Sequence, residues 1–111
     1  MPTPGEIIEQ LMATIEARRA NPPAKSYTTS LFQAGVPKIC AKITEESAEV
    51  VEAASEPGDA GRAHLIYESV DLLYHLFVLW GHQGIRLEEV TAEMARRFGV
   101  SGLDEKAARG G

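Results

Sequence analysis

The segment from Leu65 to Trp80 places acidic residues inside an otherwise apolar helix. Twelve of its sixteen residues are apolar or aromatic, and at ~100° per residue they point in nearly every direction around the helix axis. Such a helix is predicted to be buried over most of its surface. Glu68 and Asp71 nevertheless share one narrow stripe of it. Burying two carboxylates there is costly unless a positive group meets them.

Two histidines lie on the same stripe. On a helical wheel His64, Glu68, Asp71 and His75 fall within about 60° of one another. A histidine one turn from a carboxylate is typical of a hydrogen-bonded partner that orients the acid. We therefore interpret His75 as a partner of Asp71 and expect no direct catalytic role for it. His64 lies near a helix end, where an ordinary surface role is expected.

A second acidic cluster precedes this helix in the chain. The segment 38–54 carries Glu45, Glu46, Glu49 and Glu52, whose spacings of three and four residues bring like charges together on a helix. Lys38 and Lys42 lie about one turn earlier and relieve part of the repulsion. For Glu45 and Glu52 a solvated surface is an equally good interpretation. A divalent cation held between the two helices would explain the acids of both.

The residue types indicate which cation such a site would hold. An all-oxygen site suits Mg²⁺ or Mn²⁺, which share their coordination with phosphate oxygens and water. Zinc would require cysteines or histidines at ligand spacing, and Cys40 is the only cysteine. A di-iron bundle would require Glu-x-x-His on two helices, a pattern that the chain lacks.

These two acidic motifs resemble those of a known superfamily. Glu-Glu-x-x-Glu at 45–49 followed by Glu-x-x-Asp at 68–71 is similar to the all-α nucleoside triphosphate pyrophosphatases. Within that superfamily, the chain resembles the phosphoribosyl-ATP pyrophosphatase family. The supporting stretches cover nearly the whole chain: SYTTSLF at 26–32, the Lys-rich run into the first motif, YESVDLLYHLFVLW at 67–80, GIRLEEV at 84–90 and SGLDEKAAR at 101–109.

The resemblance implies a specific reaction and a set of site residues. The reaction is Mg²⁺-dependent hydrolysis of phosphoribosyl-ATP to phosphoribosyl-AMP and pyrophosphate, the second step of histidine biosynthesis, with Mn²⁺ as a possible substitute. The implied metal ligands are Glu46, Glu49, Glu68 and Asp71. The implied catalytic residues are Glu45 and Glu46, and the implied substrate contacts are Lys38, Lys42, Ser26, Tyr27 and Thr28.

Two other functions remain open at this point. The first is a house-cleaning nucleoside triphosphate pyrophosphatase that uses the same metal site on non-standard nucleotides. The second is a non-enzymatic helical dimer, in which the acidic stripe serves structure or partner binding. Metal-dependent release of pyrophosphate would exclude the second, and a comparison of substrates would separate the first.

The remaining pattern predicts a single all-α domain over residues 1–111, with 100–111 as a loosely ordered tail. We expect about four to five helices in a bundle of the all-α nucleoside triphosphate pyrophosphatase type. The predicted segments are a helix from Pro4 to about Arg19, a short one capped by Thr28 or Thr29, the acidic helix from Val36, the apolar helix from about Ala60 to Trp80 or His82, and a last helix over 87–98.

Charge and apolar content set expectations for partners. The net charge of −5 argues against a nucleic-acid partner. No apolar run is long enough to span a membrane, and one cysteine suits a reducing compartment, so we expect a cytoplasmic location. The apolar helix carries more apolar surface than one small chain can cover. We therefore expect a homodimer that uses Leu73, Phe77 or Trp80.

Overall fold

The computed structural model describes residues 1–99, which form five α-helices, and no strand occurs within that range. This confirms the all-α fold. The tail at 100–111, with its expected loose order, lies outside the described residues. Within residues 1–99, no helix has both the length and the apolarity needed to cross a bilayer. The helices are α1 (Pro4–Ala20), α2 (Tyr27–Ala34), α3 (Val36–Ala54), α4 (Gly58–His82) and α5 (Leu87–Phe98).

Short polar residues begin the first two helices. The Thr3 hydroxyl accepts a hydrogen bond from the Glu6 backbone amide at 3.1 Å, and Pro4 is the first helical residue, as predicted. For α2 the predicted cap was wrong. Ser26 caps this helix, so Thr28 and Thr29 lie inside it and are buried. The reason is that α2 begins at Tyr27, which turns both threonines toward the core.

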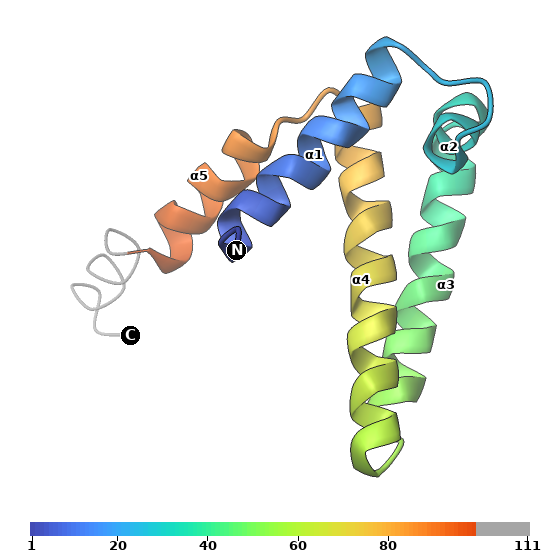
Figure 1. Ribbon diagram of the computed structural model, residues 1–111, viewed down its shortest axis with the longest axis vertical. Helices are drawn as coiled ribbons and strands as arrows, with labels where there is room; N and C mark the ends of the chain where they lie inside the picture. The colour runs from blue at the N-terminus through green and yellow to red at the C-terminus, as the bar shows by residue number, and fades with distance from the viewer. Residues whose placement is uncertain (100–111) are drawn as a thin grey trace.

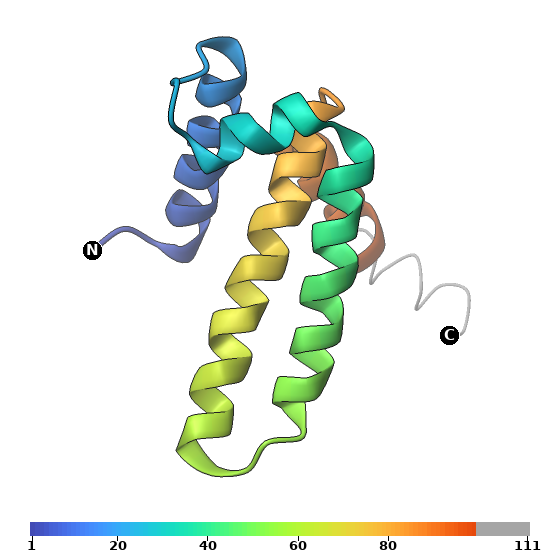
Figure 2. The same ribbon diagram turned by 90° about the vertical axis from the view of Figure 1, so that its right-hand side faces the viewer.

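Helices α3 and α4 form an antiparallel hairpin that dominates the molecule. Figure 2 shows the two helices side by side along most of their length, joined by the short loop at 55–57. No other pair of helices packs as extensively. Helix α4 begins at Gly58, two residues earlier than predicted. At the other end of the hairpin, α2 lies across α3 and α1 crosses α4 (Figures 1 and 2).

The hydrophobic core occupies only the end of the hairpin where α1 and α2 cross it. Its buried members come from four helices: Met12 and Ile15 from α1, Leu31 from α2, Ile39 from α3, and Phe77 and Val78 from α4. Gly81 of α4 allows α1 to approach closely. A Cβ at this position would lie 3.1 Å from the Ile15 Cγ2 atom and 3.6 Å from the Met12 Cε atom. Packing at this crossing is therefore already tight.

The rest of the hairpin extends beyond α1 and α2 as a two-helix arm (Figure 1). Four large apolar residues of α4 are exposed along it and form what we call the α4 apolar face: Ile66, Tyr67, Val70 and Leu73. In this single chain α4 is thus less buried than its all-round apolar sequence predicts. Of the three residues expected to meet a partner, Leu73 is 45% exposed, whereas Phe77 belongs to the core.

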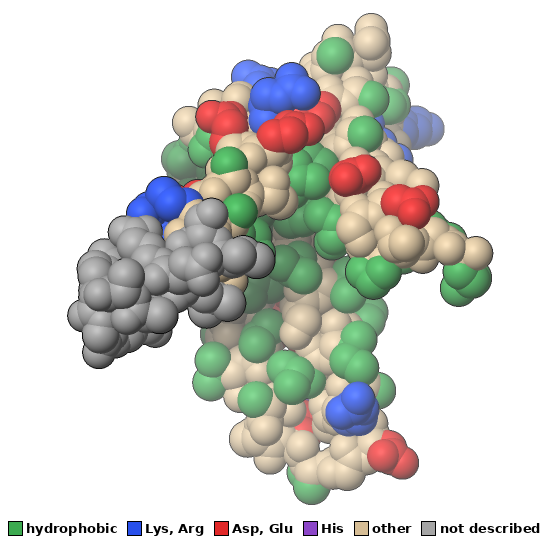
Figure 3. Space-filling model, turned by 90° about the vertical axis from the view of Figure 1, so that its left-hand side faces the viewer, with side chains coloured by type: hydrophobic (Ala, Val, Ile, Leu, Met, Phe, Trp, Pro, Cys, Tyr) green, Lys and Arg blue, Asp and Glu red, His purple; other side chains and the backbone are tan. Residues whose placement is uncertain are grey.

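Hydrophobic side chains continue from the arm into a hollow between α1 and α5, as Figure 3 shows. A cavity of about 400 Å³ lies there, and residues of α1, α4 and α5 line it. Leu73 and Phe77 contribute to its α4 wall, and Met94 to its α5 wall. The α4 apolar face and this hollow therefore form one continuous apolar surface.

The tight crossing at Gly81 leads to a stability prediction. We expect Gly81→Val to lower the free energy of unfolding by about 1–3 kcal/mol, because its branched methyl groups would overlap Ile15 and Met12. Gly81→Ala is the matched control. Its better helix propensity, worth about 1 kcal/mol, offsets the single close contact. Urea denaturation at one protein concentration measures both variants. A Gly81→Val protein as stable as the parent would contradict the packing described here.

Candidate metal and substrate site

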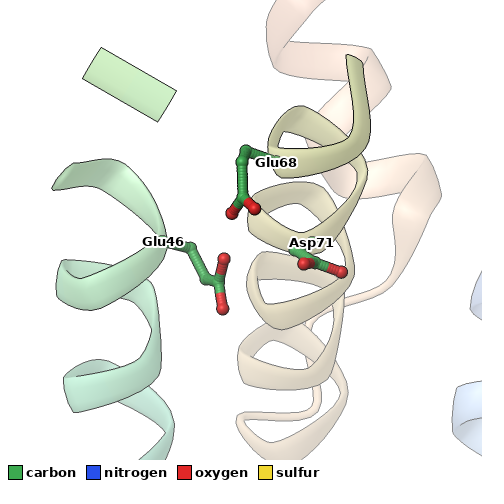
Figure 4. Close-up of side chains that lie close together, drawn as sticks. All are labelled: Glu46, Glu68 and Asp71. Carbon is green, nitrogen blue, oxygen red and sulfur yellow. The ribbon is translucent and has the colours of Figure 1, made fainter. Parts of the chain in front are cut away.

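Three of the four predicted metal ligands converge between α3 and α4. One carboxylate oxygen each from Glu46, Glu68 and Asp71 lies within 4.8 Å of the other two. Figure 4 shows the Glu46 side chain reaching from α3 toward Glu68 on α4, with Asp71 one turn further along α4. The Glu-x-x-Asp spacing places the two α4 acids on the same helix face. Glu46 and Glu68 are each only 6% exposed.

Two oxygens in this cluster have no hydrogen-bond partner. They are Oε2 of Glu46 and Oε2 of Glu68, both fully shielded from solvent. Buried carboxylate oxygens are normally satisfied by several donors, because loss of hydration is costly. A divalent cation is the partner that would satisfy both at once. The donor set contains only carboxylate oxygens, which fits Mg²⁺ or Mn²⁺ and does not fit a zinc site.

Glu49, the fourth predicted ligand, lies against Glu68. The pKa of Glu68 is raised to about 7. The largest cause is hydrogen bonding to the Glu49 carboxyl, followed by burial and by the nearby Glu46. The same contact with Glu68 holds the pKa of Glu49 below its usual range. Burial raises the pKa of Glu46. The cluster therefore shares a proton near neutral pH, which a bound cation would displace.

His64 also lies at the site, although only a surface role was predicted for it. Its Nδ1 atom lies 3.0 Å from a Glu56 carboxylate oxygen, and its Nε2 atom lies 3.4 Å from Oε1 of Glu68. The hydrogen bond to Glu56 is the main cause that raises the pKa of His64. Its position on the polar stripe of α4, one turn before Glu68, was the available signal.

The remaining charged candidates line the outer side of α3. The Lys42 ammonium group lies 3.3 Å from a Glu45 carboxylate oxygen, and the Glu45 side chain is 55% exposed. Their hydrogen bond raises the pKa of Lys42, so this residue is a cation at neutral pH. Lys38 is exposed one turn earlier. Glu45 and Glu46 therefore have different surroundings although they are adjacent in sequence, because neighbours on a helix point ~100° apart.

The hydroxyl-rich start of α2 contacts α4 near the acidic cluster. The Tyr27 hydroxyl lies 2.7 Å from Nε2 of His75, and the Thr28 hydroxyl hydrogen-bonds to that of Tyr74. Thr28 is completely buried, whereas half of Tyr27 is exposed. Nδ1 of His75 lies 2.8 Å from the Asp71 carbonyl oxygen. His75 thus contacts the backbone of Asp71, which corrects the expectation that it orients the carboxylate.

Comparison with known proteins gives a consistent result. The family model described as phosphoribosyl-ATP pyrophosphohydrolase matches residues 8–98. Three similar relatives all carry the name phosphoribosyl-ATP pyrophosphatase. The protein from Rhodopirellula baltica is 53% identical over 92% of this chain and 85% of its own length. The proteins from Rhodospirillum rubrum and Dechloromonas aromatica are 50% and 45% identical, over 97% and 95% of this chain and 91% and 94% of their own lengths.

The match includes α2 and both acidic motifs and extends to the last residue of α5. It therefore covers every side chain placed in the site above. Sequence identity of 45–53% over most of the chain confirms the resemblance first seen in the two acidic motifs. The chain therefore belongs to the phosphoribosyl-ATP pyrophosphohydrolase family of hydrolases.

Proposed function

We propose that this chain hydrolyses phosphoribosyl-ATP to phosphoribosyl-AMP and pyrophosphate, with Mg²⁺ as cofactor and Mn²⁺ as an effective substitute. The names of its relatives support the substrate. The observation that carries the metal dependence is the pair of buried, unpartnered oxygens on Glu46 and Glu68. An acidic protein that acts on a polyphosphate also needs a cation between the two negative charges.

Glu46, Glu68 and Asp71 would hold the metal, and Glu49 would join them once the proton shared with Glu68 has left. When bound, the ion would neutralise the charge of the triphosphate and of the departing pyrophosphate. Lys42 and Lys38 would contact the phosphate oxygens as point charges from the same face of α3. Lys42 would exchange its ion pair with Glu45 for one with the substrate, which leaves the Glu45 carboxylate free.

Glu45 is the residue we propose to position and deprotonate the attacking water. Its carboxylate is exposed and lies outside the buried cluster, so it can accept a proton without disturbing the metal ligands. The water oxygen forms a bond to the α- or β-phosphorus, its proton passes to Glu45, and the bond between that phosphorus and the oxygen that bridges the α- and β-phosphates breaks. Attack at either phosphorus gives phosphoribosyl-AMP and pyrophosphate.

We also propose that the active form is a homodimer. The α4 apolar face and the hollow between α1 and α5 are continuous with one another, and a contiguous exposed apolar surface commonly marks a protein–protein interface. A second copy of this chain is the simplest cover, because one two-fold axis would bury the same surface on both protomers. The arm would then gain the packing that it lacks in a single chain.

The reaction itself is tested with a panel of substrates. We expect phosphoribosyl-ATP to yield phosphoribosyl-AMP and pyrophosphate in equal amounts when Mg²⁺ or Mn²⁺ is present, and no turnover in excess chelator. ATP and other plain nucleotides should react at least about a hundredfold more slowly, a preference worth about 3 kcal/mol. Hydrolysis in ¹⁸O-labelled water identifies the phosphorus attacked. Orthophosphate as the first product, or equal rates for plain nucleotides, would reject the assignment.

The cluster is tested by removing one buried charge. Glu68→Gln should abolish metal-dependent turnover and any gain in thermal stability on adding Mg²⁺, because one ligand is lost. Without metal, the raised pKa of Glu68 means that the folded protein binds the extra proton between pH ~4.5 and about 7. The parent should therefore lose stability as pH rises through this window, and the variant should lose less.

Glu52→Gln is the matched control for that variant. It removes the same charge from an exposed position of α3 outside the cluster. Thermal melts with and without Mg²⁺, from pH 4.5 to 8, compare the two variants with the parent. If Glu68→Gln does not fold, or retains the Mg²⁺-dependent stabilisation, then Glu68 is a structural residue and the proposed site is wrong.

The dimer is tested by placing a charge on the α4 apolar face. Sedimentation at micromolar concentration should give about twice the 12.0 kDa chain mass for the parent. Val70→Glu should shift the protein toward monomer, because the new carboxylate would be buried without a partner. Gln10→Glu adds the same charge on exposed α1 and should leave the dimer intact. A monomeric parent would rule out the proposed dimer.

A further inference from the structure

Two consecutive residues of α2 are anchored to two consecutive residues of α4. Tyr27 reaches His75, and Thr28 reaches Tyr74, each through its hydroxyl group. The aromatic rings reinforce these contacts. The Tyr27 ring is nearly parallel to that of Tyr74 at 6.2 Å and stands perpendicular to the imidazole of His75 at 5.7 Å. The side chain of Tyr27 is therefore held in place even though half of it is exposed.

The hydrogen bonds of His75 determine how Tyr27 is used. The Asp71 carbonyl oxygen can only accept, so Nδ1 of His75 carries a hydrogen and donates it. In the neutral ring Nε2 is then an acceptor, and the Tyr27 hydroxyl donates to it at 2.7 Å. Burial raises the pKa of Tyr27, which keeps that hydroxyl protonated. With that hydrogen engaged, the hydroxyl oxygen of the half-exposed Tyr27 side chain has only lone pairs to offer a ligand.

Tyr27 lies close to the proposed metal site but is not part of it. Lys42 and Glu46 are both near enough to act on the pKa of its hydroxyl. The carboxylate cluster itself contains Glu46, Glu68 and Asp71, and His75 follows Asp71 by one turn of α4 toward α2. A triphosphate held at the cluster and at Lys42 would therefore place an adjoining part of the substrate near Tyr27.

We propose that His75 is a positioning residue, which orients the Tyr27 hydroxyl so that its oxygen accepts a hydrogen bond from a ribose hydroxyl of the substrate. This inference rests on the proposed function, because it concerns the same substrate. A phosphate oxygen is excluded as the partner of Tyr27, because neither atom would then supply a hydrogen.

The first experiment removes the hydroxyl group of Tyr27. Tyr27→Phe should raise KM for phosphoribosyl-ATP about three- to ten-fold, the effect of one lost neutral hydrogen bond, and leave kcat nearly unchanged. Ser30→Ala is the control. It deletes another exposed hydroxyl of α2, which donates to the backbone carbonyl oxygen of Tyr27 and not to the Tyr27 side chain, and KM should not change.

His75 is tested by two substitutions that each delete one of its hydrogen bonds. His75→Asn places a donor near the Nδ1 position but cannot reach Tyr27, so KM should rise as in Tyr27→Phe. His75→Gln places an acceptor near the Nε2 position and should restore KM to within about two-fold of the parent. Adding Tyr27→Phe to His75→Asn should raise KM no further, because both act on one contact. A purely structural His75 would instead lower stability in both variants and leave KM equal in all of them.

The chemical partner is identified with substrates that lack single ribose hydroxyl groups. One such analogue should raise KM in the parent by the same factor as Tyr27→Phe does with the full substrate. The Tyr27→Phe variant should then show no further increase in KM with that analogue. The inference would be overturned if the increases in KM from the analogue and from Tyr27→Phe were additive for every analogue. An effect of Tyr27→Phe on kcat alone would also overturn it. These results are distinct from failure of the proposed function, in which the parent itself would not cleave phosphoribosyl-ATP. Because Tyr27 is half exposed, its variant remains informative even if the His75 variants do not fold.

Discussion

The burial of carboxylates between α3 and α4 is the constraint on which the rest of the structure depends. Glu46 and Glu68 face one another across the hairpin with an unpartnered oxygen each, at a depth where an unpaired charge is strongly unfavourable. Protonation of Glu68 relieves part of this cost in the protein alone. The proposed cation would relieve it fully, so the same strain that weakens the hairpin would provide affinity for metal and, through it, for a triphosphate.

That strain has to be offset elsewhere in a small chain. The core at the crossing of α1 and α2 with the hairpin supplies the main apolar burial, with Ile15, Ile39 and Val78 fully enclosed. The arm that carries the acids contributes little to this core and exposes the α4 apolar face. The proposed dimer would therefore stabilise the region in which charge repulsion is greatest. Metal binding and assembly would then favour the same folded arm.

Helix α2 connects the core with the site. Leu31 packs into the core, while the first turn of the same helix holds Tyr27 and Thr28 against α4. These contacts set the position of α2 relative to the acidic cluster. An arrangement of this kind places a polar contact for substrate on a helix, where its geometry is more precise than on a free loop.

The sequence alone determined the five helices and the two acidic motifs, because both depend on local spacing. Apolar periodicity marks the helices, and intervals of three residues place acids on one face. Only the tertiary structure decided which acids meet. Glu46 is buried opposite Glu68, whereas its neighbour Glu45 is exposed, since the packing of α3 on α4 selects between them. The structure also revised the roles that the sequence suggested for His64 and His75, because it brings Glu56 to His64 and Tyr27 to His75 from other parts of the chain. The Tyr27–His75 contact joins positions 48 residues apart, and no local pattern encodes such a pairing.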